Sequence, residues 1–163
     1  MAAGSTYTPL ATTTLGSDAA TITFSSISGS YTDLVLVING TSNQGDTVGL
    51  QFNSDTGTNY SATRLSGNGT AASSGRWSNE AKAYYGVFYT SMTNAIINFQ
   101  NYSNTTTYKT FIARSNNAGN DVRANVGLWR STSAITSITL NFYDGTSKYS
   151  SGTVATLYGI TAA

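Results

Sequence analysis

The chain closes with Ala134-Ile135-Thr136-Ser137-Ile138-Thr139-Leu140-Asn141-Phe142 and then, after a polar interval, with Ser151-Gly152-Thr153-Val154-Ala155-Thr156-Leu157-Tyr158-Gly159-Ile160. In the first stretch Ile138, Leu140 and Phe142 alternate with Thr139 and Asn141, and the second stretch is a short, mostly apolar run that follows a Ser-Gly turn. This period of two is typical of a strand that turns one face to the core. Ile135 and Ile138 are three positions apart, which breaks the alternation, so we predict a bulge or the start of a strand near Ser137.

Similar short runs, each bounded by turn residues, occur along the rest of the chain. No segment carries an apolar stripe at helical spacing, and runs at short intervals are typical of a sandwich or barrel. The sequence therefore predicts an all-β, single-domain antiparallel β-sandwich. We count about ten strands, at 8–15, 20–25, 33–39, 47–52, 83–90, 95–102, 108–114, 122–130, 135–142 and 153–160.

Two intervals differ from this pattern. In 33–39, Leu34, Leu36 and Ile38 alternate with Val35 and Val37, so this strand should be covered on both faces near the centre of a sheet. Residues 53–79 form the longest polar interval and should make an extended loop or a loosely paired hairpin where a partner binds. We expect residues 1–8 to be a flexible N-terminal arm that docks on a neighbouring subunit, and 9–163 to form the sandwich.

Composition excludes several classes of partner. The 163 residues carry a formal net charge of +1 and no cysteine, and serine, threonine, asparagine and glycine make up about half of them. A weakly charged chain with 11 tyrosines is expected to fold around a core rather than remain disordered. The basic residues are scattered, so we expect no nucleic-acid partner. No apolar run is long enough to span a bilayer, so we expect no membrane partner.

The sequence offers little for catalysis or for metal binding. Histidine and cysteine are absent, and the acidic residues are Asp18, Asp33, Asp46, Asp55, Glu80, Asp121 and Asp144. Two of them could converge as a glycosidase pair, but most sit beside Gly, Asn or Ser in predicted turns, where aspartate accepts backbone hydrogen bonds. Residues 53–59 resemble the start of a calcium loop but lack its terminal glutamate, and a hairpin turn at Asp55-Thr56-Gly57 explains them. We expect a non-enzymatic protein without cofactor or metal.

Aromatic residues suggest where a protein partner binds. In Tyr84-Tyr85-Gly86-Val87-Phe88-Tyr89, a regular strand would place Tyr85, Val87 and Tyr89 on one face and the other three residues on the opposite face. One face should meet the core, and the other should meet a neighbouring subunit or serve as a platform for sugars. The candidate interface residues are Tyr7, Arg76, Trp77, Tyr85 and Tyr89, with Arg76 and Trp77 the best candidates for exposed contacts.

Three patches of the sequence carry a resemblance. The closing strands, the opening Tyr7-Thr8-Pro9-Leu10-Ala11-Thr12-Thr13-Thr14-Leu15-Gly16, and Tyr31-Thr32-Asp33-Leu34-Val35-Leu36-Val37 after Phe24-Ser25-Ser26-Ile27 resemble small jelly-roll virion proteins of tailed bacteriophages, of the capsid decoration or cement type. The resemblance implies a jelly-roll fold and a structural role. Such a protein binds the major capsid protein on the exterior of the virion, commonly as a homotrimer, and would be in the host cytoplasm during assembly.

A second function is compatible with the same resemblance. Related jelly-roll modules occur in tail fibres and receptor-binding tips, and fold alone does not separate these uses. In that case loop side chains such as Trp77 and Tyr60 would contact a glycan on the host surface. We expect the shell role first and keep the receptor-binding tip as the alternative.

Overall fold

The computed structural model describes residues 6–117 and 119–161, and the regular structure within them is entirely β. This confirms the predicted fold class. The described residues form twelve strands, two more than the ten predicted ranges, because the polar interval contributes a hairpin of its own. The strands are β1 (Tyr7–Thr14), β2 (Thr21–Phe24), β3 (Asp33–Gly40), β4 (Asp46–Phe52), β5 (Tyr60–Gly67), β6 (Ala72–Glu80), β7 (Ala83–Phe88), β8 (Thr93–Phe99), β9 (Lys109–Asn117), β10 (Asp121–Trp129), β11 (Ile138–Phe142) and β12 (Val154–Ile160).

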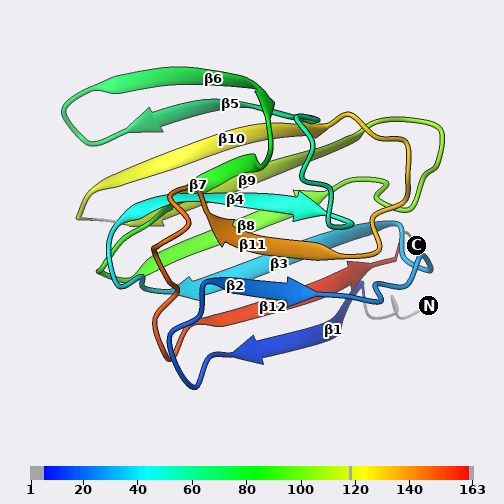
Figure 1. Cartoon of the computed structure of the whole chain (residues 1–163), viewed down its shortest axis with the longest axis horizontal. Coiled ribbons are helices and arrows are strands. Elements are labelled where there is room, and N and C mark those ends of the chain that lie inside the picture. The colour runs from blue at the N-terminus through cyan, green and yellow to red at the C-terminus, as the bar shows by residue number, and fades with distance from the viewer. Residues whose placement is uncertain (1–5, 118, 162–163) are drawn as a thin grey trace.

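Two antiparallel sheets face each other as a jelly-roll-like β-sandwich (Figure 1). The eight-stranded sheet has the order β1-β12-β3-β8-β9-β10-β5-β6, and the four-stranded sheet has the order β2-β11-β4-β7. β12 pairs with β1 on one side and with β3 on the other, so the first and last strands are neighbours in the same sheet. We call the face of the eight-stranded sheet that points away from the smaller sheet its outer face.

The core lies between the two sheets and is rich in aromatic rings. The smaller sheet contributes Phe52, whose ring centroid lies 5.4–6.2 Å from those of Tyr60, Phe99, Phe111 and Trp129 on the larger sheet. All five side chains are at most 2% exposed. Edge-to-face and tilted contacts of this kind stabilise a core beyond the area that they bury, so these rings join the two sheets.

The closing strands confirm one of the two alternatives predicted for Ser137. β11 begins at Ile138 and alternates from there, whereas Ile135 precedes the strand and donates its backbone N–H to the carbonyl of Tyr102 at 2.9 Å. Although β11 and β12 are consecutive, they belong to different sheets. The connection between them buries Tyr149, whose ring lies 4.6 Å from that of Phe142.

β3 lies inside the larger sheet, between β12 and β8, as its sequence pattern predicts. Leu34, Leu36 and Ile38 are fully buried between the sheets. On the outer face Val35 is 6% exposed and Val37 is half-buried. The strand is therefore covered on one face by the core and largely covered on the other by neighbouring side chains.

The structure corrects two boundaries expected from the sequence. Most of the polar interval forms a hairpin, one of the two predicted alternatives, but the hairpin is fully paired, because β5 and β6 pair over eight residue positions and extend the larger sheet as its edge. Tyr7 and Thr8 of the predicted N-terminal arm belong to β1, which begins at Tyr7 and pairs with β12. Residues 1–5 of that arm lie outside the described residues.

The turn around Asp55 connects two sheets and is not a hairpin turn. β4 lies in the smaller sheet and β5 in the larger one, so residues 53–59 cross between them. The Asp55 carboxylate accepts hydrogen bonds from Gly57 N (2.8 Å), Asn59 Nδ2 (2.9 Å) and Trp129 Nε1 (2.7 Å). The side-chain oxygens of Asp55 in the segment that resembles a calcium loop therefore accept hydrogen bonds from the protein itself.

Candidate protein interface

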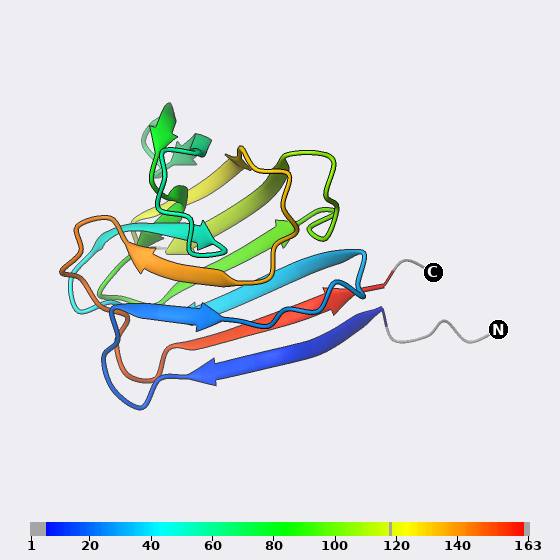
Figure 2. The same cartoon turned by 45° about the vertical axis from the view of Figure 1, so that its right-hand side comes forward.

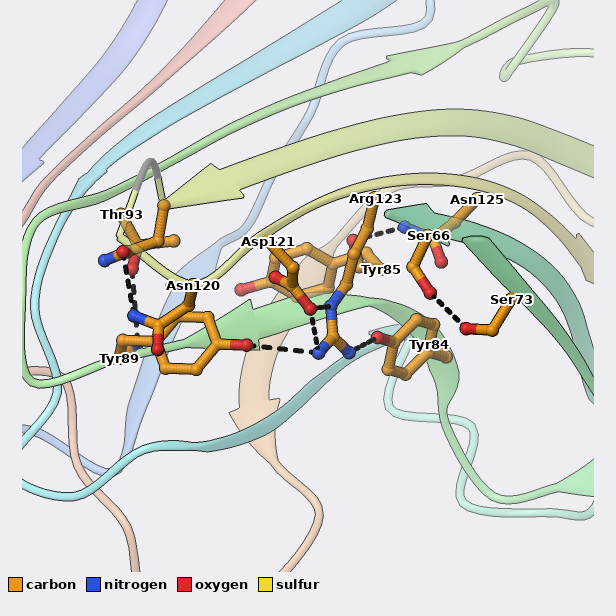
Figure 3. Close-up of polar contacts among 11 residues, drawn as sticks. Ser66, Ser73, Tyr84, Tyr85, Tyr89, Thr93, Asn120, Asp121, Arg123 and Asn125 are labelled. Atoms are coloured by element: carbon orange, nitrogen blue, oxygen red, sulfur yellow. Dashed lines mark hydrogen bonds and ion pairs between the residues drawn. The ribbon is translucent and has the colours of Figure 1, made fainter. Parts of the chain in front are cut away.

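Arg123 organises a polar cluster at the start of β10 (Figure 3). Its guanidinium donates through Nε to Asp121 Oδ2 at 2.7 Å, through Nη2 to the Tyr89 hydroxyl at 3.1 Å, and through Nη1 to the Tyr84 hydroxyl. An ion pair of 2.5 Å completes the contact with Asp121. Burial disfavours the charge, but the bonds to Asp121 and Tyr84 outweigh it and raise the pKa of Arg123. The cluster ties β10 to β7.

Trp77 supports the β5–β6 hairpin from the inner side. Its ring stacks on that of Tyr84 with centroids 4.9 Å apart and planes at 20°. The Arg64 guanidinium lies 5.1 Å from the centre of the Trp77 ring, a cation–π contact. Trp77 is therefore half-buried, and its ring contacts side chains of its own chain. The side of β7 that carries Tyr84 is thus covered by Trp77 of the same chain.

Tyr85 is not a surface residue, so the expectation that it lies in an interface is corrected. The pairing of β4 with β7 skips Tyr85, and this β-bulge turns its ring into the core. The side chain is fully buried, and its hydroxyl bonds to that of Tyr149 at 2.9 Å. Burial, together with the neighbouring Tyr149, raises the pKa of Tyr85 well above its ordinary value.

The five candidate interface residues do not come together. Tyr7 lies on β1, at one edge of the larger sheet, where it is 55% exposed and makes an edge-to-face contact with Tyr158. Arg76 is exposed on β6, at the opposite edge. Tyr89 is half-buried beside Arg123. Tyr60, named for glycan contact, is fully buried, and its hydroxyl bonds to backbone groups of Phe52 and Asp55.

The structure reveals a groove on the outer face that the sequence did not indicate. Its volume is about 970 Å³, and residues of β5, β6, β8, β9 and β10 line it. Leu65 (64% exposed) and Val122 (56%) form part of its walls, and Val126 (55%) and Ile112 (48%) lie farther along the same face. We call this feature the outer groove. Figure 2 shows how strongly β5 and β6 turn relative to β1, β12 and β3, as the twist of a large sheet requires.

The outer groove was not predicted because β10 turns polar residues toward the core and apolar residues toward solvent, the reverse of the usual arrangement. Its sequence alternates regularly, but polar Arg123 and Asn125 point inward, where Asn125 donates to the Tyr85 carbonyl at 2.9 Å. Val122, Ala124 and Val126 consequently point outward and are exposed. Alternation shows which residues share a face but not which face is buried. A strand with arginine and asparagine on one face and valines on the other was the available signal.

The carboxylates mostly serve the backbone, as the sequence predicts for aspartates in turns. Asp144 accepts hydrogen bonds from the N–H groups of Thr146 and Ser147, and Asp33 accepts from Asn101 N at 2.6 Å. Asp18 likewise accepts from Ser151 N at 2.9 Å. Among residues 6–117 and 119–161, no cluster of three or more acidic side chains is placed to hold a metal ion.

Two further findings concern the chain as a whole. In the part of the chain that the structure describes, no helix has the length and apolar character needed to cross a membrane. No known family model matches the chain, and a search of curated proteins finds no match.

Proposed function

We propose that this chain is a non-enzymatic structural protein of a tailed-bacteriophage virion, and specifically a capsid decoration protein. It binds the major capsid protein on the outside of the shell, as a homotrimer, and links neighbouring capsid subunits. The resemblance of the opening, second and closing patches motivates the proposal. Those patches form β1, β3, β11 and β12, and three of these strands are neighbours in the larger sheet.

The observation that carries the proposal is the exposed apolar surface on the outer face. Leu65, Ile112, Val122 and Val126 are each about half exposed or more, and they lie on three adjacent strands. A contiguous apolar surface on a folded protein is typical of a protein–protein contact. The rest of the surface is hydroxyl-rich and nearly neutral, which suits repeated contacts that depend on shape rather than on charge.

The alternative, recognition of a host glycan by a tail tip, has less support. A sugar platform needs an exposed ring, but of the two rings named for this role Trp77 is stacked on Tyr84 and Tyr60 is buried. The exposed rings of Tyr7 and Tyr108 do not line the outer groove. The walls of the outer groove are aliphatic rather than aromatic. These observations favour a protein partner.

The test is to compare phage particles assembled with and without this chain. Cryo-electron microscopy should find copies distributed over the shell with three-fold symmetry, and particles without the chain should lose their DNA at lower temperature or after milder osmotic shock. Adding the purified chain should restore the resistance. Copies confined to a tail appendage, or unchanged particle stability with no copies on the shell, would refute the proposal.

A further inference from the structure

The outer groove has the dimensions of a short extended peptide. It crosses five neighbouring strands, from β8 through β9, β10 and β5 to β6, close to the tips of the β5–β6 and β9–β10 hairpins. Four strand-to-strand spacings amount to roughly 19 Å, the length of about six extended residues. A volume of about 970 Å³ holds such a segment with its side chains.

The walls of the outer groove are aliphatic. Leu65 of β5 pairs with Ala124 of β10, and Val122 lies two positions further along the same face. Ile96 of β8 forms the opposite side. An extended segment presents every second side chain to one side, so aliphatic residues at alternate positions would pack against these walls.

Arg114 places one positive charge at the centre of the groove. It lies on β9 between its register partners Ile96 and Ala124, is exposed, and makes no hydrogen bond or ion pair with any described residue. The outward-facing positions of β5, β6, β8, β9 and β10 include no aspartate or glutamate. Nearby Asp121 is already paired with Arg123. A guanidinium beside apolar walls pairs well with a carboxylate, which it binds in a bidentate manner.

Charge complementarity also distinguishes between occupants. A second copy that docks face to face would bring Arg114 and Arg76 against the same basic, acid-free face, and like charges in an interface are unfavourable. Nucleic acid binding depends on several clustered cations, whereas the groove contains only Arg114 on its outward-facing positions. The occupant that fits is a different polypeptide that brings its own carboxylate.

We infer that the outer groove binds an extended segment of a partner protein, about six residues long, with aliphatic side chains at alternate positions and one aspartate or glutamate that pairs with Arg114. This inference rests on the proposed function in one respect, since it assigns the segment to the major capsid protein. In that case the outer groove is the site through which each subunit binds the capsid shell.

The binding test uses phage particles assembled without this chain and measures the affinity of added purified variants. Arg114→Gln should weaken binding about tenfold or more, because a charge-assisted contact is lost. Ala124→Glu should weaken binding at least as much. The new carboxylate would lie opposite Arg114 in the strand register and form an ion pair with its guanidinium, so that the guanidinium no longer pairs with the partner's carboxylate. Lys148→Gln and Ala20→Glu are the matched controls: both positions are exposed, they make the same charge changes, and neither lines the groove.

A photo-crosslinking experiment identifies the segment directly. With p-benzoylphenylalanine in place of Leu65, irradiation of decorated particles should join the chain to a capsid-protein peptide that contains an acidic residue and aliphatic neighbours. Wild-type binding by both groove variants, or a crosslinked peptide without an acidic residue, would overturn the inference while leaving decoration intact. Failure of the unmodified chain to bind the particles would instead refute the proposed function.

Discussion

Gly127→Ala is expected to be one of the most damaging single-methyl substitutions in this protein. Gly127 of β10 lies opposite Phe111 of β9, and an added Cβ would lie 2.0 Å from Phe111 Cζ and 2.2 Å from its Cε1. Carbon atoms in contact are normally about 3.5–4.0 Å apart, so the ring would have to retreat by roughly 1.5 Å. Phe52 and Phe99 block that retreat, with centroids 6.2 and 5.9 Å from that of Phe111.

The expected loss follows from this geometry. An extra methylene in a packed core typically costs about 1–3 kcal/mol. Here the contact is severe and the neighbouring rings are at most 1% exposed, so we expect the upper end, about 3 kcal/mol. A domain has a total stability of about 5–15 kcal/mol, so the variant should still fold with a clearly lower urea midpoint.

The assay is urea unfolding followed by tryptophan fluorescence, since Trp129 lies in the same ring cluster. Gly67→Ala is the matched strand control, because its Cβ would meet nothing nearer than 3.9 Å, and its stability should change by less than about 0.5 kcal/mol. Adding Phe111→Leu to Gly127→Ala should recover part of the loss in a double-mutant cycle. A cost below about 1 kcal/mol for Gly127→Ala, or strict additivity in the cycle, would refute the reasoning.

Three further predictions concern polar groups. Tyr60→Phe removes a hydroxyl that accepts from Phe52 N and donates to the Asp55 carbonyl, both at 3.0 Å, and should lower the free energy of unfolding by about 1–3 kcal/mol; an unchanged urea midpoint would contradict this. Desolvation opposes a lower pKa of the exposed Asp144, but the N–H and hydroxyl groups of Ser147 and Thr146 outweigh it and hold this pKa below the ordinary 3.8. The stabilising contribution of Asp144 is therefore present above pH 3.8 and disappears as the pH falls through the lower folded value. The stability difference between wild type and Asp144→Asn should therefore shrink in an acid series, and a constant difference would argue against it. Burial raises the pKa of Tyr60 to about 12 from the ordinary 10.0, and that of Tyr85 is raised as well, so stability should fall as the pH rises above 10.0; ultraviolet titration should find fewer phenolates in the folded than in the urea-unfolded chain, and equal numbers would contradict the burial.

Local chemistry made much of the fold predictable. Period-two alternation depends only on neighbouring residues, so it located most of the strands and indicated a bulge or a strand start near Ser137, next to the observed start of β11 at Ile138. The aspartate turns were likewise predictable, because Asp144 bonds to groups two and three residues away. The short runs bounded by turn residues, without an apolar stripe at helical spacing, indicated an all-β chain before any contact was known.

The candidate interface depended on information that no local pattern contains. Whether Val122 or Arg123 of β10 faces the core depends on which sheet the strand joins and which strands of the other sheet cover it. The bulge that buries Tyr85 arises from its pairing with β4, and the neighbour of Trp77 proved to be Tyr84 of the same chain.

Composition and short-range periodicity were thus enough to give the class of structure, the positions of most strands and the absence of histidine and cysteine. The folded chain was needed to show which sheet each strand joins, which alternating face is solvent-exposed, and that Leu65, Ile96, Arg114 and Ala124 line one groove. These features arise from pairing and packing between strands far apart in the chain. Burial depends on what another segment covers, and a strand's own residues do not specify that segment.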